Sequence, residues 1–219
     1  MKKCWRIIIA DDHEMVRRGV RSLVSGDDRW ELVGEADNGR DAVELAAALK
    51  PDIAILDITM PLLNGLEAAR RIRRHLPDCE VLVLTMHSSR QLLREVLDAG
   101  ARGCMLKTDA GELIVAALEA LSEHKPFFTS DVSDLLLGDY ASPRNVQEFL
   151  CERGEVLTER EREIAQLIAE GKSSKEMASE LGISVLTVDT HRANLMRKLD
   201  AHSASEVVRY AIRQGWTQA

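Results

Sequence analysis

Three separated sets of charged residues in this chain could act together in one chemical site. Asp11-Asp12, Asp57 and Lys107 each come directly after a short apolar run. The three runs are Arg6–Ala10, Ile53–Leu56 and Gly103–Leu106. Charged residues directly after β-runs, with helical patterns between those runs, predict a parallel α/β sheet whose crevice lies beyond the strand carboxyl ends. Three carboxylates and one amine would then share that crevice.

The expected crowding of carboxylates indicates a bound cation. Like charges packed closely are costly unless a positive charge neutralises them, and Mg2+ prefers carboxylate oxygens and waters as ligands. Asp11 and Asp57 could instead be helix caps after their strands, which is the better explanation for either residue alone. The presence of Lys107 in register with both favours the shared site.

The composition predicts a soluble cytoplasmic protein of two domains that makes no contact with a membrane. The chain has 219 residues, of which 45% are hydrophobic and 30% charged. No apolar stretch approaches the roughly 18 residues of a membrane span, and no basic and then apolar leader is present. The four cysteines lack metal-ligand spacing and are expected to be free thiols.

The net charge of −7 is carried unevenly along the chain. Residues 157–219 hold nine basic and nine acidic side chains, so the whole negative balance belongs to the residues before them. Acidic balance argues against non-specific nucleic-acid binding by the first part. The neutral tail must gather its positive charge on one face if it binds nucleic acid.

Apolar runs alternate with amphipathic helical patterns five times between residues 6 and 124, which predicts a doubly wound parallel sheet of five strands. The expected strands are Arg6–Ala10, Glu31–Glu35, Ile53–Leu56, Val81–Leu84 and Gly103–Leu106. The expected helices are Met15–Ser25, Arg40–Leu49, Leu66–His75, Ser89–Ala99 and Ala110–Ser122. Residues 125–156 lose this periodicity, and we interpret them as a linker with one short helix at Ser130–Leu137.

The last region, residues 157–219, is predicted to be a small all-α domain of four helices. Three of these helices open with capping-box patterns, at Thr158/Glu161, Ser173/Glu176 and Ser203/Glu206. Within this region Ser174–Leu181, a turn containing Gly182, and Val185–Leu199 follow one another as helix, tight turn and helix. This order is typical of a helix-turn-helix, whose second helix reads DNA.

The order and spacing of short motifs identify a family resemblance over nearly the whole chain. The first region, residues 1–124, resembles response-regulator receiver domains in Asp11-Asp12, Asp57–Pro61, Asn64-Gly65, Leu84-Thr85 and Gly100–Gly103 leading to Lys107. The tail resembles the LuxR-type helix-turn-helix of the NarL/FixJ subfamily in Leu157–Glu161, Glu170–Glu176, Thr187-Val188, His191-Arg192 and Lys198-Leu199. The resemblance implies a flavodoxin-like sheet of strand order 2-1-3-4-5 in the receiver.

The resemblance implies a chemical role for each charged residue of the crevice. Asp57 would be the nucleophile that takes a phosphoryl group from a phosphohistidine on a sensor histidine kinase. Asp11, Asp12 and Asp57, with the backbone carbonyl of Thr59, would hold Mg2+. Lys107 would pair with a phosphoryl oxygen. The chain would not be an enzyme beyond its own phosphorylation and dephosphorylation at Asp57.

The switch residues of the family are only partly matched. The Thr85 hydroxyl would move to hydrogen-bond the phosphoryl group, but Cys104 stands where many receivers carry a Tyr or Phe that rotates inward. Cys104 is interpreted as core filler and not as a redox site. Thr59 and His87 are either neighbours of the attacking water that set the phosphoryl lifetime or ordinary solvent-facing loop residues.

The second helix of the helix-turn-helix has two faces. Val188, Leu195 and Leu199 should face the core, which turns Asp189, Thr190, Ala193 and Arg197 toward the major groove. Phosphate contacts would come from Lys175, Ser184, Thr187, Arg192 and Lys198. Asp189 repels phosphate but accepts a hydrogen bond from cytosine N4, so we expect it to support base selection at the expense of affinity.

The implied partners are a sensor kinase, operator half-sites in double-stranded DNA, and a second copy of the chain upon activation through Ser203–Gln214. RNA polymerase is a further partner that the resemblance allows. Activation by unmasking of the tail and activation by receiver pairing both stay open. One alternative is a DNA-binding regulator that needs no phosphorylation. A second, a Mg2+-dependent phosphatase, is disfavoured because Thr59 stands where such enzymes carry a second Asp.

Overall fold

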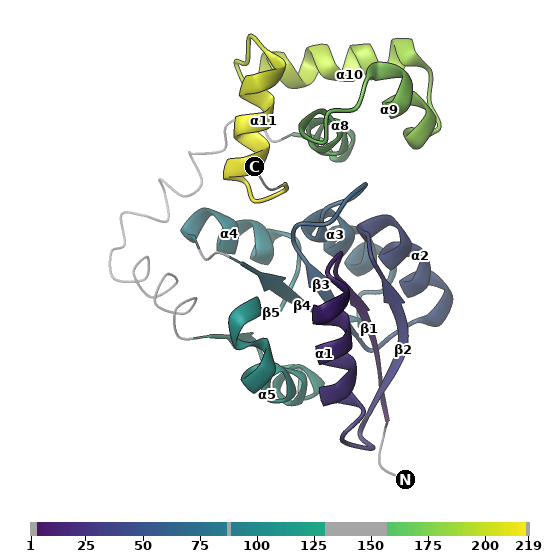
Figure 1. Cartoon of the computed structure of the whole chain (residues 1–219), viewed down its shortest axis with the longest axis vertical. Coiled ribbons are helices and arrows are strands. Elements are labelled where there is room, and N and C mark those ends of the chain that lie inside the picture. The colour runs from purple at the N-terminus through teal and green to yellow at the C-terminus, as the bar shows by residue number, and fades with distance from the viewer. Residues whose placement is uncertain (1–3, 87–88, 130–156, 218–219) are drawn as a thin grey trace. The chain divides into compact units, whose positions relative to one another are not determined.

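The computed structural model describes residues 4–86, 89–129 and 157–217. The chain divides into two compact units, Met1–Gly138 and Asp139–Ala219, and each is considered by itself (Figure 1). His87 and the helix expected at Ser130–Leu137 lie outside the described residues.

The first unit is a parallel sheet wound with helices on both faces (Figure 1). Its strands are β1 (Trp5–Ala10), β2 (Trp30–Ala36), β3 (Ile53–Asp57), β4 (Glu80–Thr85), β5 (Gly103–Leu106) and β6 (Phe127–Phe128). Its helices are α1 (Glu14–Val24), α2 (Gly39–Leu49), α3 (Gly65–His75), α4 (Arg90–Asp98), the 3-10 turn η1 (Lys107–Asp109) and α5 (Ala110–Ser122). The order β2-β1-β3-β4-β5-β6, with every pair parallel, confirms the predicted doubly wound fold.

The central strands are buried on both sides, which explains why their sequences are continuous apolar runs. Every residue of β3 and β4 is buried. On one face Ile7, Ile9, Ile55 and Leu84 pack with α1 and α5, and α2 packs against α3 elsewhere in the unit. Because all these strands are parallel, the carboxyl ends of β1, β3 and β5 lie at the same end of the sheet, with β4 between β3 and β5.

The sheet has a sixth, two-residue strand that the sequence prediction missed. Phe127 and Phe128, assigned above to the linker, pair in parallel with Gly103 and Cys104 at the edge of the sheet. The Phe127 amide donates to the Arg102 carbonyl at 2.9 Å. Two residues after Pro126 are too few to show periodicity, so pairing with a buried neighbour decides this strand and local sequence does not.

The second unit contains the four predicted helices: α8 (Glu159–Ala169), α9 (Ser174–Leu181), α10 (Val185–Lys198) and α11 (Ala204–Arg213). Their core includes the inward residues Val188 and Leu195 of α10, which are fully buried as predicted, whereas Leu199 is half-buried. Gly182 ends α9 in the left-handed region at φ 63°, which a glycine adopts without steric cost. This conformation makes the sharp turn between α9 and α10.

Two of the three predicted capping boxes are present. The side chains of Thr158 and Ser173 cap α8 and α9, and Glu161 and Glu176 bond back to the cap amides. The third prediction is wrong, because Ser203 makes no side-chain cap at α11. In a capping box, Glu206 would accept from the amide of the cap residue Ser203. Here the Glu206 carboxylate accepts instead from the amide of the preceding residue, His202, at 2.6 Å.

Candidate functional site

The carboxyl ends of β1, β3 and β5 bring Asp11, Asp57 and Lys107 together, as the sequence predicts. The Lys107 ammonium lies 2.9 Å from Asp11 Oδ2 and 2.7 Å from Asp57 Oδ2. The side chains of Asp11 and Asp57 are 0% and 2% exposed, and that of Lys107 is 6% exposed. One buried cation therefore faces two buried carboxylates, which leaves the cluster with an excess of negative charge.

Burial and charge repulsion change the acidity of this cluster. Burial, followed by the nearby Asp11 carboxylate, raises the pKa of Asp57 to about 7, although Lys107 and the Thr59 amide oppose the rise. Burial lowers the pKa of Lys107, but its bonds to Asp57 and Asp11 outweigh this and raise it overall. Asp57 is thus poised near neutral pH beside an ammonium that stays charged.

Asp12 and His13 complete the acidic cluster at its exposed side. The ligand atoms of Asp11, Asp12, His13 and Asp57 all lie within 4.8 Å of one another. His13 Nδ1 is 2.6 Å from Asp12 Oδ1 and 3.1 Å from Asp11 Oδ1, and the His13 amide donates to Asp11 Oδ1 at 2.8 Å. His13 was not predicted to join the cluster, although its position directly after the Asp pair at a strand end was an available signal.

The predicted switch residues sit on the neighbouring strands. Thr85 ends β4 and is 4% exposed, one residue beyond the register partner of Asp57. Cys104 is buried in β5, where burial raises the pKa of its thiol to about 12, so the thiol stays protonated. Its register partner on β6 is Phe128. Thr59, two residues after Asp57, is half-buried.

Gly65 allows α3 to begin against the backbone of Asp57. Asn64 caps the helix through the Glu67 amide at 2.9 Å, and the Gly65 amide donates to the Ile58 carbonyl at 2.8 Å. A Cβ atom at Gly65 would lie 1.9 Å from the Asp57 carbonyl oxygen. The sequence pair Asn64-Gly65 therefore holds the strand end that carries Asp57.

Gly65→Ala is expected to destabilise the first unit by about 2 kcal/mol, because α3 or the end of β3 must shift to admit the methyl group. The displaced Asp57 should also weaken binding of beryllium fluoride. Thermal unfolding measures the loss of stability, and a titration with beryllium fluoride in the presence of Mg2+ measures the loss of binding. The control is Gly19→Ala in α1, where a Cβ meets nothing within 4 Å and unfolding should be unchanged or delayed. Equal effects of both variants would contradict this account of Gly65.

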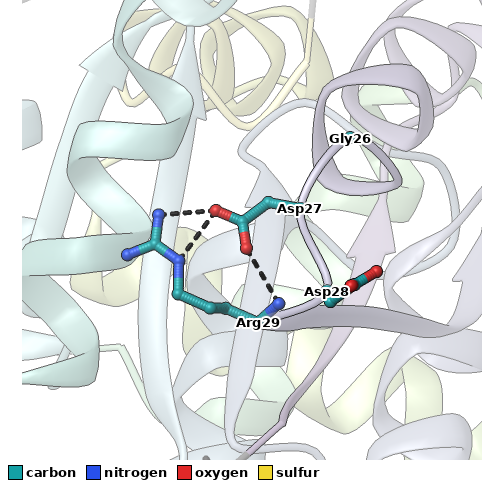
Figure 2. Close-up of a pocket in the computed structure, with 4 residues that line it drawn as sticks. All are labelled: Gly26, Asp27, Asp28 and Arg29. Atoms are coloured by element: carbon teal, nitrogen blue, oxygen red, sulfur yellow. Dashed lines mark hydrogen bonds and ion pairs between the residues drawn. The ribbon is translucent and has the colours of Figure 1, made fainter.

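A surface hollow lies away from this cluster, beside the turn between α1 and β2 (Figure 2). Gly26, Asp27, Asp28 and Arg29 line it. The Arg29 guanidinium is paired with Asp27 at 2.6 Å and with Glu119 of α5 at 2.7 Å. These pairs join the turn to α5 near the start of β2. The amino ends of the strands lie there, whereas Asp57 lies at a carboxyl end.

The predicted DNA-contacting residues of the second unit occupy several environments. Lys175, Asp189, Thr190, Ala193 and Arg197 are exposed. Ser184 caps α10 by accepting from the Thr187 amide at 3.1 Å. Ser174, which the sequence analysis did not single out, donates to Asp189 Oδ1 and accepts from Arg192, both at 2.9 Å. This network ties the start of α9 to the first half and middle of α10.

Lys198 has a structural partner. Its ammonium lies 2.8 Å from Glu161 Oε2, and the two side chains are 16% and 4% exposed. Glu161 also accepts from the Thr158 amide at 2.8 Å. Although burial raises the pKa of Glu161, Lys198 and the cap bonds lower it overall. The pair joins the end of α10 to the start of α8.

Comparison with known proteins places the chain in a family. The model of the response regulator receiver domain matches residues 7–119, and the model of bacterial regulatory proteins of the luxR family matches residues 155–211. The chain belongs to the NarL/FixJ family of two-component response regulators, which are DNA-binding transcription regulators and not catalytic enzymes. The pocket formed by Asp11, Asp12 and Asp57 is typical of the Mg2+ site of a receiver.

Individual relatives match over almost their full length. The chain is 37% identical over 214 residues to the transcriptional regulatory protein LiaR of Bacillus subtilis, covering 95% of this chain and 97% of LiaR. It is similar to RcsB of Salmonella enterica serovar Typhimurium bound to promoter P1flhDC with a phosphomimetic, at 28% identity, TM-score 0.61 and coverage of 94% and 97%. It also resembles a structure of two RcsB dimers bound to two parallel DNAs, at 28% identity, TM-score 0.58 and coverage of 97% and 99%.

Among the described residues, no helix has the length and apolar character needed to cross a membrane. Of the helices described in the second unit, α10 is the longest, with 14 residues.

Proposed function

We propose that Asp57 accepts a phosphoryl group from a sensor histidine kinase, and that this event controls pairing of two chains and operator binding by α10 in the cytoplasm. The observation that carries the proposal is the convergence of Asp11, Asp57 and Lys107 at one sheet edge, with distances of 2.7 and 2.9 Å to the ammonium. The similarity to RcsB on promoter DNA with a phosphomimetic supports the link from receiver to DNA.

The chain's own residues supply most of the chemistry. A carboxylate oxygen of Asp57 forms a bond to phosphorus while the bond from phosphorus to the kinase imidazole nitrogen breaks, and the imidazole leaves with that electron pair. Lys107 neutralises charge on the phosphoryl oxygens from a fixed, water-excluded position. The Thr85 hydroxyl donates to another phosphoryl oxygen and carries the change into β4.

The residues fit Mg2+ as the cofactor of this site. Asp11, Asp12 and Asp57, with the Thr59 carbonyl, would hold the ion through hard oxygen ligands. The buried Oδ2 atoms of Asp11 and Asp57 share the single ammonium of Lys107, at 2.9 and 2.7 Å, so a second cation is needed to balance the two carboxylates. When bound, the ion would supply positive charge that offsets the carboxylates and orients the phosphoryl oxygens.

On the DNA side, we assign base contacts to the exposed face of α10 and phosphate contacts to its flanks. Asp189, Thr190, Ala193 and Arg197 would face base edges, and Lys175, Ser184, Thr187 and Arg192 would face phosphates. The Ser174 bond to Asp189 fixes one carboxylate oxygen, and the other is directed to cytosine N4. Lys198 is assigned to its ion pair with Glu161 and not to DNA.

DNA affinity with and without a phosphoryl analogue tests the proposal. The full chain first selects duplexes from a random library. Its affinity for these duplexes is then measured in the presence of Mg2+ alone and of Mg2+ plus beryllium fluoride. Wild type should bind about tenfold more tightly with the analogue, a usual size of coupling between two sites, and Asp57→Ala should not respond. Equal affinity of wild type in both conditions would favour the alternative, a regulator that needs no phosphorylation.

A further inference from the structure

One line of exposed residues along α10 includes several apolar groups. Leu186, Thr190, Ala193 and Arg197 follow at spacings of four, three and four residues, which places them on one face of a helix with 3.6 residues per turn. All four are exposed, and the buried residues Val188 and Leu195 lie on the opposite side of the helix. We call these four residues the outer stripe.

Leu186 stands out within this stripe. Its side chain is 77% exposed, and the neighbouring Val185 is 39% exposed. In the described part of the second unit, these are the large apolar side chains most open to solvent. A single exposed leucine is ordinary on a protein surface. Here, however, it lies in the first turn of α10, the helix to which the proposed function assigns the base contacts, so its position continues that proposed interface.

Two polar groups near Leu186 are already bonded within the protein. The Thr190 hydroxyl donates to the Leu186 carbonyl at 2.9 Å, and Asp189 Oδ1 accepts from Ser174 at 2.9 Å. The Thr190 hydroxyl is thus used one turn back along the helix. The outer stripe therefore presents to a binding partner the Leu186 side chain and the methyl groups of Thr190 and Ala193. Its last residue is the cation Arg197.

We propose that Leu186 and the methyl group of Thr190 read thymine in the operator through its C5-methyl group. That methyl group distinguishes thymine in the major groove and is contacted there by apolar side chains and by the methyl groups of Ala and Thr. The inference rests on the proposed DNA-binding function and deepens it. It assigns Leu186, which the sequence analysis did not select, to base reading.

Replacing thymine by uracil tests this contact, because the change removes only the C5-methyl group. The probe is a duplex selected from a random library by the full chain with Mg2+ and beryllium fluoride. Uracil at one or two thymines of a half-site should weaken wild-type binding about fourfold each, the size expected for one buried methyl group. Uracil in the flanks of the same duplex is the control.

Two variants connect the effect to the outer stripe. Leu186→Ala and Thr190→Ser should each lose affinity for the thymine duplex and lose sensitivity to uracil at one position, as a double-mutant cycle requires. Thr190→Ser keeps the hydroxyl that bonds to Leu186, so it isolates the methyl group. Both positions are exposed, and circular dichroism should show unchanged folding.

Several outcomes would overturn the inference. Thymine reading is contradicted if no thymine of the selected half-site can be replaced by uracil with a loss of affinity. It is also contradicted if uracil weakens binding by both variants as much as binding by wild type. Either result leaves DNA binding itself intact. Tighter DNA binding by Leu186→Ala without the phosphoryl analogue would place Leu186 against a protein surface and also contradict it. Failure of wild type to select any duplex would defeat the proposed function itself.

Discussion

Replacement of Asp57 by asparagine is expected to stabilise the first unit at pH 8 in the absence of Mg2+, by about 2–4 kcal/mol. The pKa of Asp57 is raised to about 7 by burial and by Asp11, from an ordinary value of 3.8. At pH values between these two pKa values, the Asp57 carboxyl holds a proton in the folded chain and releases it in the unfolded chain. The free energy of unfolding therefore falls as pH rises from about 4 to 7 and is level above that range. Asparagine has the same shape and does not ionise, so it avoids this cost.

Thermal unfolding of wild type and Asp57→Asn between pH 5 and 8 measures this effect. The advantage of the variant should be largest at pH 8 and should shrink toward pH 5. Added Mg2+ should stabilise wild type more at pH 8 than at pH 6, because protons compete with the ion for the same oxygens. Asp12→Asn, at a carboxylate that is 38% exposed, is the control and should change stability little. A less stable Asp57→Asn at pH 8 would refute the electrostatic account.

Loss of the Glu161 charge should destabilise the second unit by about 3 kcal/mol, because it leaves the Lys198 ammonium largely buried without its partner. Glu161→Gln is the informative change, since glutamine still accepts from the Thr158 amide as capping boxes allow. The pKa of Glu161 is lowered in the folded state, so its contribution is present above the ordinary pKa and is lost as pH falls through the folded pKa. Calorimetry of the full chain should show the second unit unfolding earlier in the variant.

The same ion pair distinguishes Lys198 from Lys175, for which we propose a phosphate contact. Lys175→Met should reduce the dependence of log K on log salt by about one unit, as loss of one phosphate contact does. Lys198→Met should leave this slope unchanged and lower stability instead. A salt slope reduced equally by both substitutions would show that Lys198 leaves Glu161 to bind phosphate.

Much of the receiver fold and its charged cluster could be predicted from sequence, because buried parallel strands have continuous apolar sequences and their carboxyl ends share an edge. Asp11, Asp57 and Lys107 meet there for that reason. β6 could not be predicted, since two residues carry no period and the strand depends on pairing with β5. The prediction of a capping box at Ser203 was wrong, because such a pattern specifies residue types but not the path of the chain into the helix.

Interactions between side chains were the harder part of the site. His13 was missed because its contacts with Asp11 and Asp12 follow from the turn after β1, which sequence spacing does not determine. The ion pair of Lys198 with Glu161 could not be predicted, because an alternating helix face does not reveal a partner 37 residues earlier in the sequence. Leu186 was not selected for base contacts, although its spacing from Thr190 places it on the outward face of the helix, where the structure leaves it exposed.

The molar mass of the full chain by light scattering, with Mg2+ and then with Mg2+ plus beryllium fluoride, tests the central claim most directly. Wild type should shift toward the mass of two chains on addition of the analogue, and Asp57→Ala should not. No shift in wild type, or the same shift in Asp57→Ala, would contradict control of pairing through Asp57.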